Sequence, residues 1–392
     1  MPFAAALSEH PVPATAVAEV AGEVLERLGP APDLAMLFVS PHHAGALEDA
    51  AAALDDILRP GTLLGCAGIS VVGTAREVER APAVSLWAGR FGPTQAVRLT
   101  AVRTMDGVAL DGWPMEVDFK PSAFLLLADP FSFPVDTLYA ELAERHPGLR
   151  VVGGNASAAV GPGGNRLVLD RRVHTSGAVG ALVGPGVEIE TVVSQGCRPI
   201  GRPYIVTRSE LNHVYELGGT PALERLVQMS ADAMSEADID LIDQGLHLGQ
   251  VIDEHKLDYE RGDFLVRSVL GADRSDGAIV VDEFVPMGAT VQFHVRDAAT
   301  ADEDLRQLLS GRQAGGALVF TCNGRGVHLF GAPDHDARVL DERVGAPAAG
   351  FFAAGEFGPV GGRNFLHSFT ASIALFRDAE GSSRLPPSRA AQ

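Results

Sequence analysis

The sequence is poor in cysteine, and its few cysteines are badly placed for metal or disulfide chemistry. Cys66, Cys197 and Cys322 are the three cysteines among 392 residues; they lie far apart, and no CxxC motif is present. A structural zinc site needs clustered ligands, and a disulfide framework needs an even set of suitably spaced cysteines. Both are therefore excluded, and reduced thiols in a reducing compartment are expected.

The chain also lacks the segments that carry a protein into or through a membrane. Its N-terminus, MPFAAALSEHPVPAT, has no basic region and too short an apolar run for a signal peptide. No stretch of about 18 uncharged apolar residues occurs that could span a bilayer. We therefore expect a cytoplasmic protein with no membrane partner.

Basic charge is scarce as well. There are 31 lysine and arginine residues against 50 aspartate and glutamate residues, which gives a formal net charge of −19. Such a charge repels phosphate backbones, and the basic residues are scattered rather than gathered in a run that could reverse the field locally. Nucleic acid is therefore not an expected partner.

The sequence does contain ample apolar material for a core. Hydrophobic residues make up 46% of the chain and charged residues 21%, which is a globular composition. A chain of 392 residues exceeds what a single core usually supports, so two domains are expected.

Three segments share one order of elements: an apolar strand, a polar loop, an amphipathic helix, a second strand and a loop of small residues. The first strands begin at residues 34, 123 and 317, and the closing loops are Gly65-Cys66-Ala67-Gly68, Gly153-Gly154-Asn155-Ala156 and Gly355-Glu356. Each segment spans roughly thirty residues, the length of a βαβ unit. The pattern predicts three βαβ units and indicates a duplicated architecture.

Between these units, apolar and polar residues alternate along shorter strands. The alternation covers residues 84–91, 96–102, 178–183, 204–207 and 291–295, and it predicts antiparallel meanders. Together the two patterns favour an α/β (α+β) fold with mixed sheets in two domains, and they argue against a doubly wound fold or a barrel.

Composition shifts divide the chain into four predicted parts. These are an N-terminal helical segment (1–31), a first domain (32–218), a second domain (219–377) and a disordered Ser-, Pro- and Arg-rich tail (378–392). The boundary between the domains is placed before Thr220, a good helix N-cap, with Pro221 at the first helical position.

Three stretches of the sequence are distinctive. They are Ser194-Gln195-Gly196-Cys197-Arg198-Pro199-Ile200-Gly201, the segment from Phe320 to Gly326, and the segment from Gly350 to Thr370. All three closely resemble signature sequences of FIST proteins, the first near the end of the N-terminal FIST domain and the other two in the C-terminal one. The resemblance covers roughly residues 32–375 in family order.

The resemblance implies two consecutive FIST domains and a bacterial sensory protein for signal transduction that binds a small ligand. Some bacterial members resemble haem-linked nitric-oxide sensors. No kinase, methyl-accepting or cyclase segment is attached here. We therefore expect a standalone sensor of a small polar ligand, for example an amino acid, that signals through a separate partner protein.

Candidate ligand contacts follow two of the predicted strands. Cys322 ends a buried strand and precedes Asn323, Gly324 and Arg325, where glycine lets the backbone approach a ligand closely. Arg325 beside the thiol is expected to lower the pKa of Cys322. The alternative is a small buried cysteine with no role beyond packing. Asn155, in the small-residue loop of the second unit, is a further candidate.

Two charged residues complete the candidate set. Pro199 holds Arg198 extended, so its guanidinium could meet a ligand carboxylate or a protein acid such as Glu188 or Glu190. Glu356 lies in an apolar, glycine-rich stretch, where a carboxylate must be paired or functional. It could accept a ligand ammonium or the backbone N–H groups of its own loop.

Two other functions remain open from the sequence. Haem binding would need an axial ligand such as His294, His328, His335 or His367, or one of the pair His42-His43, but none lies in a recognisable haem motif. The cofactor is therefore left unassigned. A Cys322–His367–Glu356 set would suit a cysteine-dependent hydrolase or transferase, although the sequence shows no complete catalytic apparatus. A protein-interaction scaffold without a ligand is the last alternative.

Overall fold

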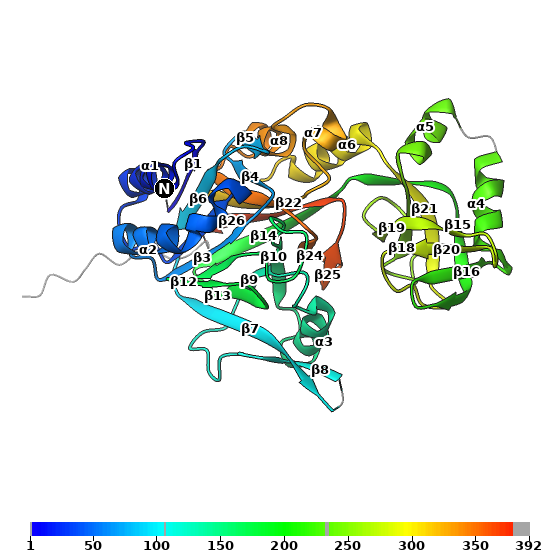
Figure 1. The fold of residues 1–392 in the computed structure, drawn as a ribbon, viewed down its shortest axis with the longest axis horizontal. Coiled ribbons are helices and arrows are strands. Elements are labelled where there is room, and N and C mark those ends of the chain that lie inside the picture. The colour runs from blue at the N-terminus through cyan, green and yellow to red at the C-terminus, as the bar shows by residue number, and fades with distance from the viewer. Residues whose placement is uncertain (1, 106, 232–234, 379–392) are drawn as a thin grey trace, which may run out of the picture.

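The computed structural model describes residues 2–105, 107–231 and 235–378, and it divides into two parts (Figure 1). The body comprises residues 2–195 and 297–378, and the lobe comprises residues 197–296. The disordered tail predicted for 378–392 lies, from residue 379 on, outside the described residues. No helix in the described ranges is long and apolar enough to cross a membrane.

The three predicted βαβ units are confirmed. The first consists of β2 (Leu34–Val39), α2 (Leu47–Leu58) and β3 (Thr62–Ala67), the second of β9 (Ala123–Ala128), α3 (Val135–Arg145) and β10 (Arg150–Asn155), and the third of β22 (Gly316–Cys322), α8 (His335–Arg343) and β23 (Ala348–Ala353). In each unit the two strands pair in parallel. In the first and third units a short helix precedes the long one: η1 (Pro41–Ala46) and α7 (Val327–Phe330), respectively.

Each unit is the centre of one mixed sheet of the body. The first sheet has the order β1 (Phe3–Ser8), β6 (Val84–Gly89), β2, β3, β11 (Leu167–Leu169), β12 (Arg172–His174). The second has the order β25 (Arg363–His367), β24 (Glu356–Val360), β10, β9, β13 (Ala178–Val183), β7 (Thr94–Thr104), β8 (Gly107–Asp111). The third has the order β14 (Val187–Gln195), β26 (Thr370–Asp378), β22, β23, β4 (Ser70–Gly73), β5 (Arg76–Glu79). The second and third sheets therefore combine strands from both ends of the chain.

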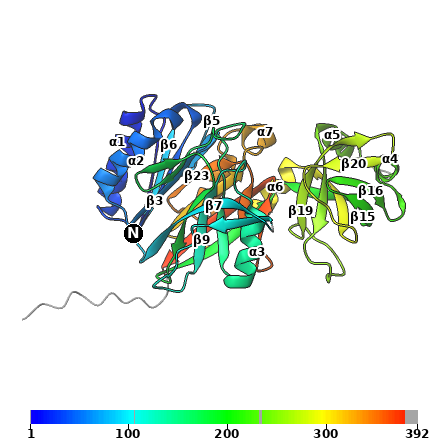
Figure 2. The ribbon, with the colours of Figure 1, turned by 60° about the horizontal axis from the view of Figure 1, so that its bottom comes forward.

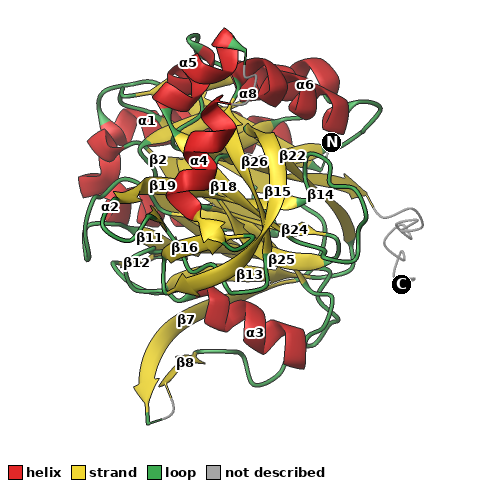
Figure 3. Cartoon of the chain, turned by 90° about the vertical axis from the view of Figure 1, so that its right-hand side faces the viewer, coloured by secondary structure: helices red, strands yellow, loops and turns green. Residues whose placement is uncertain are grey.

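The three sheets enclose one central core. In β2, Leu34, Met36 and Phe38 face this core, while the alternate residues face α2 and α1 (Pro13–Leu28). The same period of two occurs in β9 and β22, which present Leu125 and Phe320 to the central core. Helices α3, α6 (Ala298–Leu309) and α8 cover the outer faces of the second and third sheets (Figure 3).

The lobe is a barrel. Its strands are β15 (Cys197–Glu210), β21 (Thr290–Arg296), β18 (Leu246–Val251), β19 (Phe264–Asp273), β20 (Ala278–Val281) and β16 (His213–Leu217), and β16 pairs again with β15 to close the ring. The interpretation against a barrel is therefore wrong for this part. Alternation along a strand is the same in an open meander and in a closed barrel, and closure here depends on the long β15 pairing on both sides.

Helices α4 (Ala222–Ala231) and α5 (Glu236–Gln244) pack against strands of the barrel, α4 against β16 and β20 and α5 against β21 and β18. Thr220 and Pro221, predicted to start a helix, instead form the short strand β17 (Thr220–Pro221) on β16, and the helix follows directly. Several strands lie outside the predicted ranges, and β1, at the edge of the first sheet, lies in the segment predicted to be helical; its alanine-rich run has low intrinsic strand propensity. Its pairing with β6 overrides that preference.

The chain enters and leaves the lobe at adjacent points. Cys197 pairs with Arg296 in the register of β15 and β21, and the Asp297 N–H donates to the Gly196 carbonyl over 3.3 Å. Figure 2 shows the lobe standing beside the body, with α6 on the side of the body that faces it. We call the region around these two crossings the junction.

Candidate functional site

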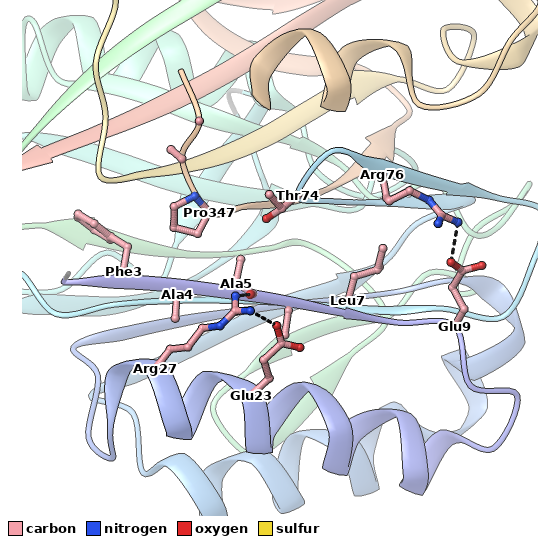
Figure 4. Close-up of a pocket in the computed structure, with 13 residues that line it drawn as sticks. Phe3, Ala4, Ala5, Leu7, Glu9, Glu23, Arg27, Thr74, Arg76 and Pro347 are labelled. Carbon is pink, nitrogen blue, oxygen red and sulfur yellow. Dashed lines mark hydrogen bonds and ion pairs between the residues drawn. The ribbon is translucent and has the colours of Figure 1, made fainter. Parts of the chain in front are cut away.

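A groove in the body runs along the free edge of β1 (Figure 4). It has a volume of about 740 Å³ and is lined by β1, by side chains of α1, and by residues 345–347. Its charged side chains are already paired: Arg27 lies 2.6 Å from Glu23, and Arg76 lies 2.7 Å from Glu9. The groove therefore offers space but no charge that needs a partner.

At the junction, the loops after the parallel strands meet. The Asn155 N–H donates to the Gly355 carbonyl over 2.9 Å, and the Asn155 side chain donates to the Ala354 carbonyl over 3.3 Å. The Asn323 N–H donates to the Ala353 carbonyl over 2.8 Å. The structure thus brings the loops that begin at Gly153, Cys322 and Gly355 to one edge of the body.

Arg325 is fully buried in this region. Its Nε and Nη2 each donate to Asp336 over 2.7 Å, and the guanidinium holds the pKa of Asp336 well below its usual range although burial acts against ionisation. Nη1 has no hydrogen-bond partner among the described residues and points toward Gly196. One donor of a buried cation is therefore left over.

Glu356 is also fully buried. Its Oε2 accepts from the Thr370 N–H over 3.2 Å and from the Thr370 hydroxyl over 2.8 Å, whereas Oε1 has no partner within the described ranges. Burial raises the pKa of Glu356 to about 8, against the opposing effects of the Thr370 hydrogen bonds and the charge of Arg325. Half of this carboxyl group is thus satisfied by the protein and half is not.

The lobe adds polar atoms from the other side. Arg296 donates from Nη2 to the Gly324 carbonyl and leaves Nε without a partner in the described chain. Both ring nitrogens of His247, and Nε2 of His294, also lack hydrogen-bond partners among the described residues. Burial lowers the pKa of both imidazoles to about 4. Both histidines are therefore neutral at pH 7.

We call Gln195, His247, His294, Arg296, Arg325 and Glu356 the junction cluster. Among the described residues, twelve buried side-chain polar atoms have no hydrogen-bond partner, and seven of them belong to these six side chains. Buried polar groups in native proteins are nearly always paired, because leaving them unpaired is costly. Their concentration at one place is what a site for a polar ligand requires.

The pKa of Cys322 is not lowered, as the neighbouring Arg325 led us to expect, but raised. Burial, followed by the negative charge of Glu356, raises the pKa of the Cys322 thiol to about 12, although Arg296 acts in the opposite direction. The charge of Arg325, which was expected to lower this pKa, is instead directed at Asp336. Cys322 is therefore a protonated thiol in the wall of the junction.

Of the other predicted site residues, some lie at the junction and one lies outside it. Asn155 and Glu356 lie together at the junction, whereas Asn323 is exposed at its rim. Arg198 is half-buried and bonds Asp297 over 2.7 Å and Asp238, rather than Glu188 or Glu190. Its guanidinium connects β15 to α5 and to the start of α6.

Four of the six members of the junction cluster were not predicted as contacts of a small polar ligand: Gln195, His247, Arg296 and His294, of which only His294 was considered, as a haem ligand. Gln195 lies inside the first distinctive stretch, two residues before Cys197, so its place in that motif was a usable signal. His247, His294 and Arg296 carry no local signal, because they come together only when β18 pairs with β21 in the folded lobe.

Two of the other candidate histidines, His367 and His335, are held by protein groups. His367 Nε2 lies 3.0 Å from the Gly358 carbonyl, and His335 lies 2.9 Å from both Asp302 and Asp336. Within residues 2–105, 107–231 and 235–378, no group of three or more His, Cys, Asp or Glu side chains is arranged to hold a metal ion.

Comparison with known proteins agrees with the motifs. The family model of the FIST N domain matches residues 33–220, and that of the FIST C domain matches residues 222–359. An uncharacterized protein of Mycobacterium tuberculosis is 45% identical over 372 residues, covering 93% of this chain and 96% of that protein. An uncharacterized protein of Mycobacterium bovis is also 45% identical over 372 residues, covering 93% of this chain and 95% of its own length.

Proposed function

We propose that this chain, which belongs to the FIST family of sensory and signal-transduction proteins, is a standalone sensor that binds a small polar ligand at the junction between body and lobe. The observation that carries the proposal is the junction cluster, in which buried donors and acceptors lack partners within the described residues. A ligand that met them would recover the hydrogen bonds that burial has cost.

The charges of the cluster favour a ligand with two unlike ends. Arg325 Nη1 and Arg296 Nε are donors suited to a carboxylate, and Glu356 Oε1 is an acceptor suited to an ammonium group. Glu356 and Arg325 lie close enough for their charges to interact, so a short molecule could span them. A small zwitterion such as an amino acid fits this pattern.

A reducing, cytoplasmic setting and a separate signalling partner are parts of the same proposal. The three cysteines are buried and free, which suits a reducing compartment. A thiol with a pKa of about 12 is protonated at neutral pH, which speaks against the alternative of a cysteine-dependent hydrolase or transferase.

Thermal melts with each of the twenty common amino acids test the proposal. We expect at least one to raise the melting temperature of the wild-type protein and to do so much less for Glu356→Gln, whose affinity should fall by roughly 10–100-fold. Glu188→Gln, an exposed change in the body, is the control and should keep the wild-type response. A response that is equal in all three proteins would place the ligand elsewhere.

A further inference from the structure

One residue of the junction has a strained backbone. Phe369 has a φ of +66°, in the left-handed region that bulky side chains avoid. It lies in the turn between β25 and β26, directly before Thr370. A bulky residue keeps such a conformation only where surrounding contacts impose it, and such residues cluster at functional sites.

On the lobe side, the ring and the carbonyl of Phe369 contact both points where the chain passes between body and lobe. The ring centroid lies 4.4 Å from that of His247, and the Arg296 guanidinium lies 5.4 Å above the ring. The Phe369 carbonyl accepts from the Gly196 N–H over 2.9 Å. The ring therefore touches β18 and β21, and the backbone binds the linker into β15.

On the body side, the same turn is tied to the proposed ligand contact. Thr370, the next residue, donates both its N–H and its hydroxyl to Oε2 of Glu356. A change in charge or hydrogen bonding at Glu356 must therefore act on the backbone of the Phe369 turn.

We propose that Phe369 is a positioning residue that couples occupancy of the junction to the orientation of the lobe. The inference rests on the proposed function, because the occupant is the ligand proposed there. In this proposal the strained turn, which has contacts with both parts of the molecule, exchanges between the observed arrangement, in contact with His247 and Arg296, and one in which these contacts are broken. A ligand engaging Glu356 shifts that balance through Thr370, since it can favour only the arrangement in which it binds better.

The coupling can be measured without knowing the ligand. Spin labels on Glu26→Cys in the body and Arg274→Cys in the lobe report the distance between the two parts, because both positions are exposed while Cys66, Cys197 and Cys322 are buried. We expect one narrow distance distribution for the otherwise unchanged chain. Phe369→Gly removes the ring and accepts the positive φ, and His247→Ala removes the surface it grips; each should broaden the distribution.

Two controls separate coupling from damage. Phe365→Ala removes another aromatic ring from the preceding strand β25, one that lies beside Arg363 and meets His367 edge-on rather than contacting the lobe, and should leave the distribution narrow. Phe369→Tyr keeps the ring and should behave as wild type. Far-ultraviolet circular dichroism identifies any variant that fails to fold, and His247→Ala then carries the test.

The decisive comparison is a double-mutant cycle. Glu356→Gln replaces the titratable carboxyl group and alters its hydrogen bonding to Thr370, and it should shift the distance distribution in the presence of Phe369 but not in Phe369→Gly. Equal shifts in both backgrounds, or narrow distributions in both Phe369→Gly and His247→Ala, would overturn the coupling. Failure of the proposed function would show separately, as an absence of any amino-acid response in the melts, because these measurements need no ligand.

Discussion

In the interior of the body, strands such as β2 and β22 divide apolar side chains between the central core and the covering helices, whereas at the junction buried side chains keep polar atoms without partners among the described residues. Both regions are shielded from water. Burial in the first stabilises the fold, because apolar area leaves water. Burial in the second costs free energy that the protein alone does not recover.

Two carboxyl groups make the same contrast at close range. Asp336 and Glu356 are both fully buried, and both lie near Arg325. The Arg325 guanidinium faces Asp336 directly, and the pKa of that carboxyl falls; Glu356 has only the hydroxyl and N–H of Thr370, and its pKa rises to about 8. The difference indicates that Asp336 belongs to the scaffold and that Glu356 is poised for a ligand.

The largest expected effect comes from breaking the buried ion pair between Asp336 and Arg325. Asp336→Asn leaves Arg325 buried and without its counter-charge, and the free energy of unfolding should fall by about 3–5 kcal/mol. Urea denaturation followed by circular dichroism measures it. Asp341→Asn, an exposed change on the same helix α8, should cost less than about 0.5 kcal/mol. Similar costs for the two variants would contradict the role assigned to Asp336.

A smaller effect is expected in the pH dependence of stability. Because the pKa of Glu356 rises from 4.5 to about 8 on folding, the native state holds this proton where the unfolded state has lost it. Its contribution should therefore weaken as the pH rises from about 4.5 to about 8, at roughly 1.4 kcal/mol for each pH unit within that range. Glu77, whose pKa is also raised to about 8 by burial and the charge of Asp336, adds a slope of the same sign.

The difference in unfolding free energy between the wild type and Glu356→Gln isolates the contribution of Glu356 from that of Glu77. The free energy of unfolding of the wild type should fall more steeply over this pH range than that of the variant, in urea titrations at several pH values. Parallel curves would mean that Glu356 is ionised in the native state at neutral pH and is paired by the protein.

Cysteine reactivity probes the wall of the junction. With a pKa of about 12 and little exposure, Cys322 should react with a thiol reagent at least about 100-fold more slowly in the native protein than in urea. Timed labelling followed by peptide mass spectrometry gives the rate at this residue. Rapid native labelling at Cys322 alone would show an open, activated thiol and would revive the hydrolase alternative.

The smallest effect belongs to the groove along β1. Arg27 and Glu23 form an exposed pair one helical turn apart, so Arg27→Ala should cost at most about 1 kcal/mol, even though its hydrogen bond to the Ala5 carbonyl is also lost. It should leave any amino-acid response in the thermal melts unchanged. Loss of that response would move the ligand from the junction to the groove.

How far the sequence predicts this architecture depends on whether a signal is local. The βαβ units were predictable because each strand and helix carries its own periodicity, and parallel pairing follows from the connection. The barrel was not, because its closure joins β15 to β16 and β21 without leaving a mark on any single strand.

The same limit applies to the junction. Glu356 stood out because a carboxylate in an apolar, glycine-rich stretch conflicts with its surroundings. Arg325 was placed beside Cys322 by sequence neighbourhood, and its true partner, Asp336, lies on a separate helix. His247 and Arg296 could be found only once the lobe was folded, since the Phe369 ring that they contact belongs to the opposite part of the chain.

Native mass spectrometry of freshly purified protein tests the central claim most directly. We predict that part of the wild-type population carries one additional small molecule, and that Glu356→Gln and Arg296→Ala, each of which removes one half of the proposed contact, lose that mass while Glu188→Gln retains it. A bound molecule that is present to the same extent in all four proteins would contradict a ligand site at the junction.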